Sequence, residues 1–232
     1  MNQQKKFVSA VVAAGGSGTR MGAEKNKLFL NLCDIPVLAH TLLALEKSAD
    51  IDEIVIPARE EDIGEILSLV QEYKIKKVTA VVKGGSHRAA SVKAALEKVS
   101  EMADFIAVHD GARPLISQDI IKNTIEAAQT YKAAACGVRS KCTLKRIDED
   151  GFIAETVNRE EIYEIQTPQI FEKGLIFEAY HCAEEILEKA TDDCSLVERL
   201  GEKIYVTDGA YCNIKVTTPE DILLAEKILE EA

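Results

Sequence analysis

The fold of this chain is decided by the stretch Ala13-Ala14-Gly15-Gly16-Ser17-Gly18-Thr19-Arg20-Met21-Gly22-Ala23-Glu24-Lys25-Asn26-Lys27. An apolar run at 7–12 precedes it and reads as a buried strand. Four glycines within eight positions allow positive φ and let the backbone approach a ligand with no Cβ in the way. Arg20, Lys25 and Lys27 then place three cations directly after the bare backbone. Because exposed amide groups backed by cations suit a polyphosphate, we predict a nucleotide triphosphate site here.

Strand-like apolar runs and amphipathic helical stretches alternate along most of the remaining chain. We expect strands at 7–13, 53–56, 77–82, 105–109, 133–138 and 203–206, and helices at 37–46, 61–72, 88–99, 118–131, 172–189 and 195–200, with a last helix capped by Thr218. Repeated β-α units build a mostly parallel sheet covered by helices on both faces. The predicted fold is therefore α/β and Rossmann-like, and the glycine-rich stretch lies beyond the carboxyl end of a strand, where such sheets bind ligands.

The alternation stops after Val138, and a polar segment follows. The segments 143–147 and 152–157 can pair as strands about the turn 148–151. This hairpin is charged on both sides and has little to pack on the main sheet. It is either a solvated β-excursion or an arm, residues 139–160, that projects and pairs with a second subunit, which would cover its edges. We expect one domain, residues 1–232, with this arm as a subdomain within it.

Composition excludes several classes of protein. The 232 residues hold 28 Lys and Arg against 39 Asp and Glu, a net charge of −11, which argues against nucleic acid as a partner. Six cysteines without C-x-x-C spacing match neither a zinc site nor a disulfide scaffold, and are typical of reduced thiols in a cytosolic protein. No apolar run approaches about 18 residues, so we expect no membrane span, and the polar N-terminus has no signal-peptide core. A cytoplasmic protein is expected.

The glycine-rich stretch fails two better-known patterns. A Walker loop needs G-x-x-x-x-G-K-[ST], but the sixth position from Gly15 is Arg20. A dinucleotide fingerprint needs G-x-G-x-x-G, but the last position is Met21, and the second strand ends at 56–58 without the acid that would hold a ribose. Both mismatches argue against these classes of protein, a dinucleotide-dependent oxidoreductase and a P-loop hydrolase.

Two further turns are expected at the same edge of the sheet. In Val108-His109-Asp110-Gly111-Ala112-Arg113-Pro114, Asp110 ends a strand and either helps to hold Mg²⁺ or forms an Asx turn. His109 is expected to be packed rather than catalytic. In Gly84-Gly85-Ser86-His87-Arg88-Ala89-Ala90-Ser91, the backbone and the Ser91 hydroxyl can read a base edge, although Gly-Gly before a helix is often only a turn.

Seven motifs, taken together, resemble one family. After the glycine-rich stretch come G-G-x-x-R-x-x-S-V at 84–92, V-H-D-x-A-R-P at 108–114, T-x-K-R at 143–146, T-P-Q-x-F at 167–171, T-D-x-x-S at 191–195 and N-I-K-V-T-x-P-E-D at 213–221. The order resembles that of the 2-C-methyl-D-erythritol 4-phosphate cytidylyltransferases of the non-mevalonate isoprenoid route. The resemblance implies transfer of CMP from CTP to the sugar phosphate, which gives 4-diphosphocytidyl-2-C-methyl-D-erythritol and pyrophosphate, with Mg²⁺ or another divalent cation.

The resemblance also implies residue roles. Arg20 and Lys27 would stabilise the transition state, while Arg159 and Lys215 would place the attacking phosphate. CTP would be bound by Ala13, Ala14, Gly15, Gly16, Gly18, Gly85, Ser86, Ser91, Asp110 and Ala112, with Asp110 at the metal. The sugar phosphate would be bound by Thr143, Arg159, Thr167, Thr191, Asp192 and Lys215. The family resemblance further implies a homodimer in which the arm of one chain, carrying Thr143 and Arg159, completes the site of its partner.

Two departures and two alternatives accompany this interpretation. The chain has Asn26-Lys27-Leu28 where members of the family often have Pro-Lys-Gln, and Cys142-Thr143 where Asp-Thr is usual. A ribitol 5-phosphate cytidylyltransferase uses the same loop and chemistry, and a nucleotide-binding regulator without catalysis is a reading from another class. No His or Cys dyad stands beside the loop, which agrees with a nucleophile that is already a charged phosphate monoester.

Overall fold

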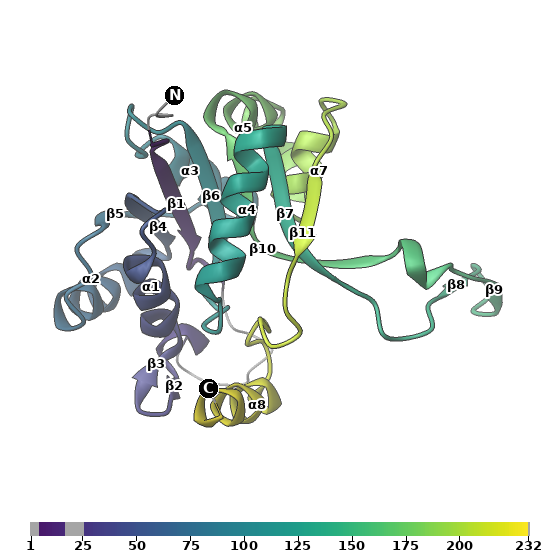
Figure 1. Cartoon of the computed structure of the whole chain (residues 1–232), viewed down its shortest axis with the longest axis horizontal. Coiled ribbons are helices and arrows are strands. Elements are labelled where there is room, and N and C mark those ends of the chain that lie inside the picture. Colours follow the sequence, from purple (N-terminus) through teal and green to yellow (C-terminus); the bar gives the residue numbers. More distant parts are fainter. Residues whose placement is uncertain (1–4, 17–25, 232) are drawn as a thin grey trace.

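The computed structural model describes residues 5–16 and 26–231, and its centre is a sheet in the order β11-β7-β10-β6-β1-β4-β5 (Figure 1). The strands are β1 (Val8–Ala13), β4 (Glu53–Ala58), β5 (Val78–Lys83), β6 (Phe105–Asp110), β7 (Ala133–Arg139), β10 (Tyr163–Glu172) and β11 (Tyr205–Asp208). Strands β5, β4, β1 and β6 are parallel neighbours, as are β11 and β7, whereas β10 runs antiparallel to both β6 and β7. The predicted α/β fold with a mostly parallel sheet is confirmed.

Helices cover both faces of the sheet, because alternate residues of its strands point to opposite sides. In β1, Val8, Ala10 and Val12 belong to one core cluster and Val11 belongs to the other. The first cluster is completed by α1 (Val37–Lys47), α2 (Ile63–Glu72), α4 (Gln118–Tyr131) and α8 (Pro219–Glu230), and the second by α3 (Arg88–Leu96), α5 (Lys173–Tyr180), α6 (Glu184–Lys189) and α7 (Asp193–Glu198). None of the helices in the described part of the chain is long and apolar enough to cross a membrane.

Short elements connect these layers. They are the 3-10 helices η2 (Lys27–Phe29), η3 (Glu60–Asp62) and η4 (Arg159–Glu161) and the small strand pair β2 (Asn31–Leu32) and β3 (Ile35–Pro36). The expected cap of the last helix is confirmed, because Thr218 and Asp221 form a capping box before α8, with Pro219 in its first turn.

The sequence interpretation is wrong for the region after the arm. It assigns no strand to 163–171, where β10 lies in the middle of the sheet, and it predicts one helix over 172–189, where α5 and α6 are separate. Strand β10 is hidden from pattern reasoning because Pro168 and a register shift between Ile165 and Gln169 interrupt it.

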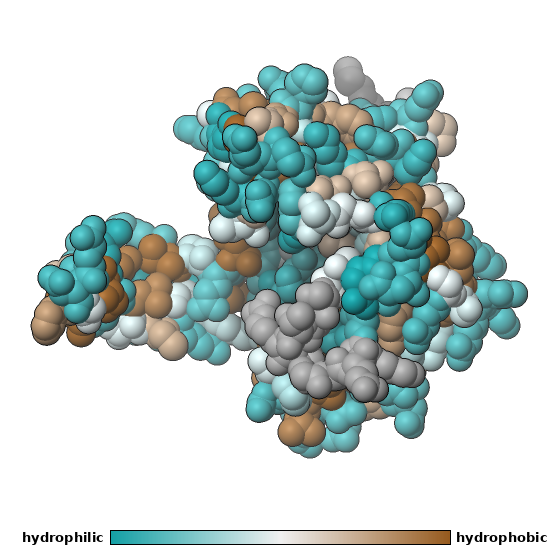
Figure 2. Space-filling model, turned by 180° about the vertical axis from the view of Figure 1, so that it is seen from behind, coloured by the Kyte–Doolittle hydropathy of each residue, from teal (hydrophilic) through white to brown (hydrophobic). Residues whose placement is uncertain are grey.

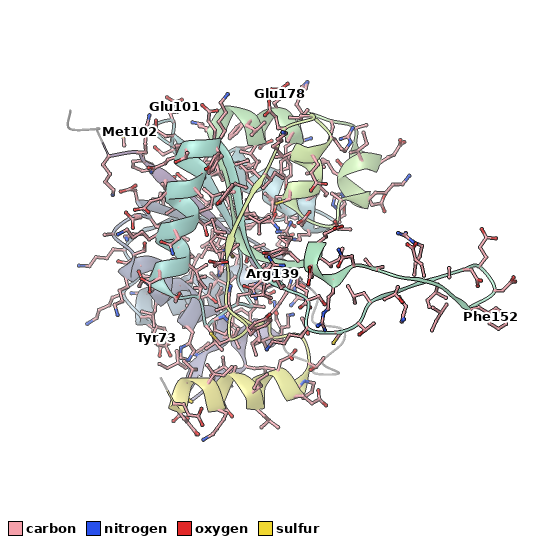
Figure 3. The ribbon with its side chains drawn as sticks, turned by 45° about the vertical axis from the view of Figure 1, so that its right-hand side comes forward. Tyr73, Glu101, Met102, Arg139, Phe152 and Glu178 are labelled. Carbon is pink, nitrogen blue, oxygen red and sulfur yellow. The ribbon has the colours of Figure 1, made fainter. Side chains whose placement is uncertain are left out.

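The predicted arm projects from the body of the molecule (Figures 1 and 3). Its strands β8 (Lys145–Ile147) and β9 (Ile153–Thr156) form a separate hairpin, whose residues are all exposed. Figure 3 places Arg139 at the base of the arm and Phe152 at its far end. Phe152 is 71% exposed and Ile153 is 63% exposed, and Figure 2 shows apolar groups on the arm where it stands clear of the body.

The sheet register brings the predicted site residues to one edge. Ala13 lies directly opposite Asp110 in the β1–β6 pair, so the last residues of both strands share the carboxyl edge. The parallel strands β4 and β5 end at Ala58 and Lys83 on the same edge. The loops that follow β1, β5 and β6 therefore converge, as the sequence predicts.

Candidate active site

A cavity of about 400 Å³ lies where these loops converge. Its lining is Ala13, Gly15, Gly16, Lys27, Leu28, Gly85, Ser86, His87, Arg88, Ser91, Asp110, Ala112, Lys215 and Thr217. These include every described residue that the sequence assigns to CTP except Ala14, together with Lys27 and Lys215. The lining holds three cations, Lys27, Arg88 and Lys215, and one carboxylate, Asp110. This excess of positive charge suits an anionic ligand.

The loop after β1 offers bare backbone to the cavity. Ala14 is fully buried, and its N–H donates to the carbonyl of Pro57 at 3.0 Å, so its contribution ends inside the sheet. Neither Gly15 nor Gly16 has the positive φ that the sequence interpretation allowed for, and a Cβ on Gly16 would meet nothing within 4 Å. The glycine character of this part of the loop leaves open space beside the backbone. Gly18, Arg20 and Lys25 lie outside the described residues.

Lys27 is held at the cavity by the cap of its own short helix and by the segment that contains Val216. It is the first residue of η2, and Asn26 caps that helix by accepting from the N–H of Leu28 at 3.2 Å. The Asn26 amide also donates to buried Asp62 at 2.8 Å, while Lys27 Nζ donates to the carbonyl of Val216 at 2.7 Å. Asn26, one of the two departures from the family pattern, thus has a structural role in fixing the position of Lys27.

The second wall is the turn between β5 and α3. The Ser91 hydroxyl accepts from the N–H of Gly85 at 3.1 Å and donates to the carbonyl of His87 at 3.0 Å. His87 Nδ1 accepts from the N–H of Ala90 at 3.2 Å and so caps α3. A Cβ on Gly85 would overlap Ala90, which means that this turn packs tightly on the first turn of the helix. The turn lines the cavity, and whether it also reads a base edge stays a prediction.

Asp110 is the carboxylate of the cavity and is surrounded by cations. Lys215 Nζ lies 2.8 Å from its Oδ2, and the Nε atoms of Arg88 and Arg113 each lie 3.6 Å from one of its oxygens. Its backbone N–H donates to Thr167 Oγ1 at 3.0 Å. Burial favours the neutral carboxyl, but Lys215, Arg88 and Arg113 outweigh it and hold the pKa of Asp110 well below its usual range.

His109, beside it, is buried and takes no part in the cavity. Its Nδ1 lies 3.0 Å from Thr167 Oγ1 and accepts from that hydroxyl, because the ring proton is on the other nitrogen; the hydroxyl in turn accepts from the backbone N–H of Asp110. Nε2 lies 3.4 Å from the carbonyl of Arg113, so the neutral tautomer carries its proton there. Burial lowers the pKa of His109 to about 4. The prediction that His109 is packed is confirmed.

The structure adds an ion pair that sequence reasoning missed. The guanidinium of Arg88 donates from a terminal nitrogen to Asp193 Oδ2 at 2.6 Å, and the Tyr180 hydroxyl donates to Oδ1 of the same carboxylate at 2.5 Å. Burial alone would lower the pKa of Arg88, but Asp193 and Asp110 together raise it. Arg88 is the arginine of the motif G-G-x-x-R, whereas Asp193 fills a variable position of T-D-x-x-S, and their separation of 105 positions in the chain hides the contact.

The residues predicted for the sugar phosphate are not brought together within one chain. Thr191 and Asp192 precede α7, where Asp192 caps the helix by accepting from the N–H of Ser195 at 2.9 Å. Thr167 lies under Asp110, and neither Thr143 nor Arg159, both on the arm, lines the cavity. Lys215 lies between two cavities, since it lines the 400 Å³ cavity and also a smaller one of about 230 Å³ beside Arg113 and Gln166.

The described residues of the cavity provide only part of a ligand set for a metal ion. Among residues 5–16 and 26–231, no three His, Cys, Asp or Glu side chains are grouped so that they could hold an ion. Asp110 is the one carboxylate in the described lining of the cavity. One carboxylate fits Mg²⁺ when substrate phosphates and water supply the other oxygen ligands.

Comparison with known proteins gives a consistent result. The family model "IspD: 2-C-methyl-D-erythritol 4-phosphate cytidylyltransferase" matches residues 8–231. The enzyme of that name from Bacillus cereus (strain ATCC 10987) is 42% identical over 219 residues, which are 94% of this chain and 96% of the relative. The enzyme from Clostridium novyi (strain NT) is 42% identical over 222 residues, 95% of this chain and 96% of the relative.

Solved structures agree with the sequence relatives. The crystal structure of 4-diphosphocytidyl-2C-methyl-D-erythritol synthase from Anaerococcus prevotii has a TM-score of 0.85 at 35% identity, and the match covers 97% of each chain. The 2-C-methyl-D-erythritol 4-phosphate cytidylyltransferase from Thermus thermophilus has a TM-score of 0.77 at 29% identity, covering 97% of this chain and 99% of the other.

Proposed function

Because the chain belongs to the 2-C-methyl-D-erythritol 4-phosphate cytidylyltransferase family, we propose that the 400 Å³ cavity is the CTP half of its active site. The enzyme transfers CMP from CTP to 2-C-methyl-D-erythritol 4-phosphate in the non-mevalonate isoprenoid route. The proposal rests on one observation: bare backbone, Lys27, Lys215 and the carboxylate of Asp110 line one cavity at the carboxyl edge of the sheet.

The orientation of CTP follows from the chemistry of the walls. The triphosphate lies against Gly15, Gly16 and Lys27, where open backbone and a cation meet. The cytosine lies at the turn of Gly85, Ser86 and Ser91, whose backbone groups and hydroxyls suit a base edge. The ribose lies near Ala112 and Asp110, and the backbone of Ala13 forms the floor.

The sugar-phosphate half combines residues of two chains. Lys215, Thr167, Thr191 and Asp192 come from the same chain as the CTP cavity, and Thr143 and Arg159 come from the arm of a partner in a homodimer. Support comes from the projecting arm, its exposed apolar end and its distance from the cavity lining of its own chain. The whole chain, residues 1–232, is one nucleotidyltransferase domain, with 139–160 as an arm subdomain within it.

Residues of the chain have to bring two anions together rather than generate a nucleophile. A phosphate monoester carries roughly −1.5 to −2 charge near pH 7, so it attacks the α-phosphorus of CTP without a general base. His109 is neutral and buried, which agrees with this. Arg20 and Lys27 neutralise charge that develops at the α-phosphate, and Arg159 and Lys215 hold the attacking phosphate in line.

Members of the family use divalent cations, and we assign Mg²⁺ to this enzyme, with Asp110 as its protein ligand. When bound, the ion neutralises charge on the triphosphate. Both Asp110 oxygens face cations, so the carboxylate becomes available only when Lys215 turns to a substrate phosphate. The six cysteines are all free thiols, which favours a cytoplasmic location.

Pyrophosphate release with CTP, Mg²⁺ and methylerythritol phosphate tests the reaction, with ribitol 5-phosphate and the other nucleotides as controls. Lys27→Ala should keep the fold and lose about 10²–10³ in rate, the usual cost of one preorganised donor to developing charge. Near-normal turnover of this variant would refute the assignment of the cavity. Arg159→Ala should raise KM for the sugar phosphate more than KM for CTP.

Mixing these two variants tests the exchanged arm. In a mixed dimer of Lys27→Ala and Arg159→Ala chains, one site combines a wild-type loop with a wild-type arm, and the other combines both substitutions. Activity should therefore return on mixing if the arm acts in the site of its partner. An arm that serves its own chain leaves both sites defective, and the mixture stays inactive.

A further inference from the structure

Arg88 occupies a place that neither substrate assignment explains. It begins α3 in the wall of the cavity, with Nε 3.6 Å from Asp110 Oδ1 and a terminal nitrogen 2.6 Å from Asp193 Oδ2. Asp110 belongs to the CTP half of the proposed site. Asp193 begins α7 directly after Thr191 and Asp192, which belong to the sugar-phosphate half. One guanidinium therefore contacts both halves.

The segment around Asp193 is fixed by other contacts as well. Gln169 Oε1 accepts from the backbone N–H groups of Asp193 and Cys194 at 3.1 and 3.0 Å, and Gln169 Nε2 donates to Asp192 Oδ2 at 2.9 Å. The Tyr180 hydroxyl donates to Asp193 from the opposite side. Asp193 itself is fully buried, so its charge depends on Arg88 for compensation.

We propose that Arg88 is a positioning residue for cytidylyl transfer, which holds Asp110 with one guanidinium nitrogen and Asp193 with another and so keeps the two halves of the site in register. The inference rests on the proposed assignment of the two halves. An arginine is needed because its planar fork reaches two carboxylates at once, whereas a lysine ammonium is a single point charge. Loss of register matters because a misplacement of about 1 Å can cost roughly 10²-fold in rate.

Arg88→Lys separates charge from geometry. The lysine keeps the positive charge next to buried Asp193, so the melting temperature should stay close to that of the wild type. It cannot also hold Asp110, so kcat should fall about 10- to 100-fold, the range expected for misalignment. Arg88→Gln removes the charge as well and should lower both quantities. Wild-type kcat in Arg88→Lys would overturn the proposal.

Two matched variants control for stability. Tyr180→Phe removes one hydrogen bond to Asp193 but leaves the Arg88 pair, and Ser9→Ala removes a hydroxyl that donates to buried Glu53 at the amino end of the sheet, far from the cavity. Both should lower the melting temperature, and Ser9→Ala should keep its kcat. If kcat in Arg88→Gln falls only as far as lost stability predicts from these controls, Arg88 is merely structural.

A double-substitution cycle tests the link itself. Asp193→Asn keeps the shape of the side chain and removes its charge, and should reduce kcat as Arg88→Lys does. Because both changes break one connection, the double variant should be no slower than the worse single variant. Independent, multiplying losses contradict the proposal. Lys27→Ala separates failure of the proposed active site from failure of the positioning role. If Lys27→Ala loses its rate while the Arg88 variants keep theirs, the assignment of the active site is supported and the positioning role of Arg88 is refuted.

Discussion

Gly85→Ala is a steric test of whether the turn between β5 and α3 forms part of the CTP site. A Cβ built on Gly85 would lie 3.0 Å from the carbonyl carbon and 3.2 Å from the Cα of Ala90, and closer still to the Ala90 Cβ. Carbon atoms prefer separations of about 3.5–4.0 Å, so relief of the contact with the Ala90 Cβ requires the turn or the start of α3 to move by roughly 1 Å or more. Ala90 also donates its N–H to His87, so the shift disturbs the helix cap.

The expected cost divides between stability and binding. Overpacking of this kind typically destabilises a protein by about 1–3 kcal/mol. Displacement of the turn should raise KM for CTP by about tenfold or more, while KM for the sugar phosphate changes little. Gly64→Ala is the matched control, since Gly64 lies in α2 with nothing within 4 Å of its Cβ position, and alanine there should be stabilising by roughly 0.5–1 kcal/mol.

Steady-state kinetics with each substrate varied in turn, and urea unfolding of both variants, give the answer. Gly85 has no positive φ, so an alanine can adopt its backbone conformation and any effect is steric. A Gly85→Ala enzyme that is destabilised but keeps its KM for CTP would show that this turn packs on α3 without forming the nucleotide wall.

Three further predictions concern pH, the arm and the metal. Because burial lowers the pKa of His109 to about 4, from about 6.5 when unfolded, only the unfolded chain binds this proton between those values. The contribution of neutral His109 to the free energy of unfolding should therefore be complete above pH 6.5, and the free energy should fall by about 3 kcal/mol as the pH drops to 4. Urea unfolding of His109→Gln at several pH values should show a smaller change with pH, and an unchanged dependence on pH contradicts this. Phe152→Asp combined with Ile153→Asp should dissociate the dimer in light scattering without unfolding the chain, since both side chains are exposed; an unchanged mass argues against an arm-mediated dimer. EDTA should stop pyrophosphate release and Mg²⁺ should restore it, and Asp110→Asn should raise the Mg²⁺ concentration needed; an unaltered requirement removes Asp110 as a ligand.

The parallel half of the sheet and its ligand edge could be predicted from sequence. Buried parallel strands are near-continuous apolar runs, as in β1 and β6, and such runs are visible without any knowledge of the partner strand. Helix α4 has the predicted bounds, 118–131, because Ser117 caps it and its apolar residues recur at helical spacing. Once these strands are parallel, Ala13 and Asp110 must share an edge.

Strand β10 could not be predicted for a physical reason. Its buried centre holds Gln166, Thr167 and Gln169, which read as loop residues because burial of polar groups is costly unless they find partners. The partners are distant in sequence: Asn213 donates to Gln166, and His109 accepts from Thr167. The same limit hides the Arg88–Asp193 pair. The quoted motifs include Arg88, Thr167 and Gln169, but only the fold shows which residues they contact.

The distribution of charge explains how a chain with a net charge of −11 can bind two anions. Arg88 faces both Asp110 and Asp193, so it adds little positive field to the cavity, and Lys27 and Lys215 supply most of it among the described lining residues. Lys215 pairs with Asp110 at 2.8 Å, and in the proposed mechanism it leaves this carboxylate when a substrate phosphate offers an equivalent negative charge. The exchange of one anion for another at similar distance changes the Coulomb energy little, while Arg113 and Arg88 still compensate Asp110. Under the proposed assignment, Asp110 keeps Lys215 at the point where the attacking phosphate arrives.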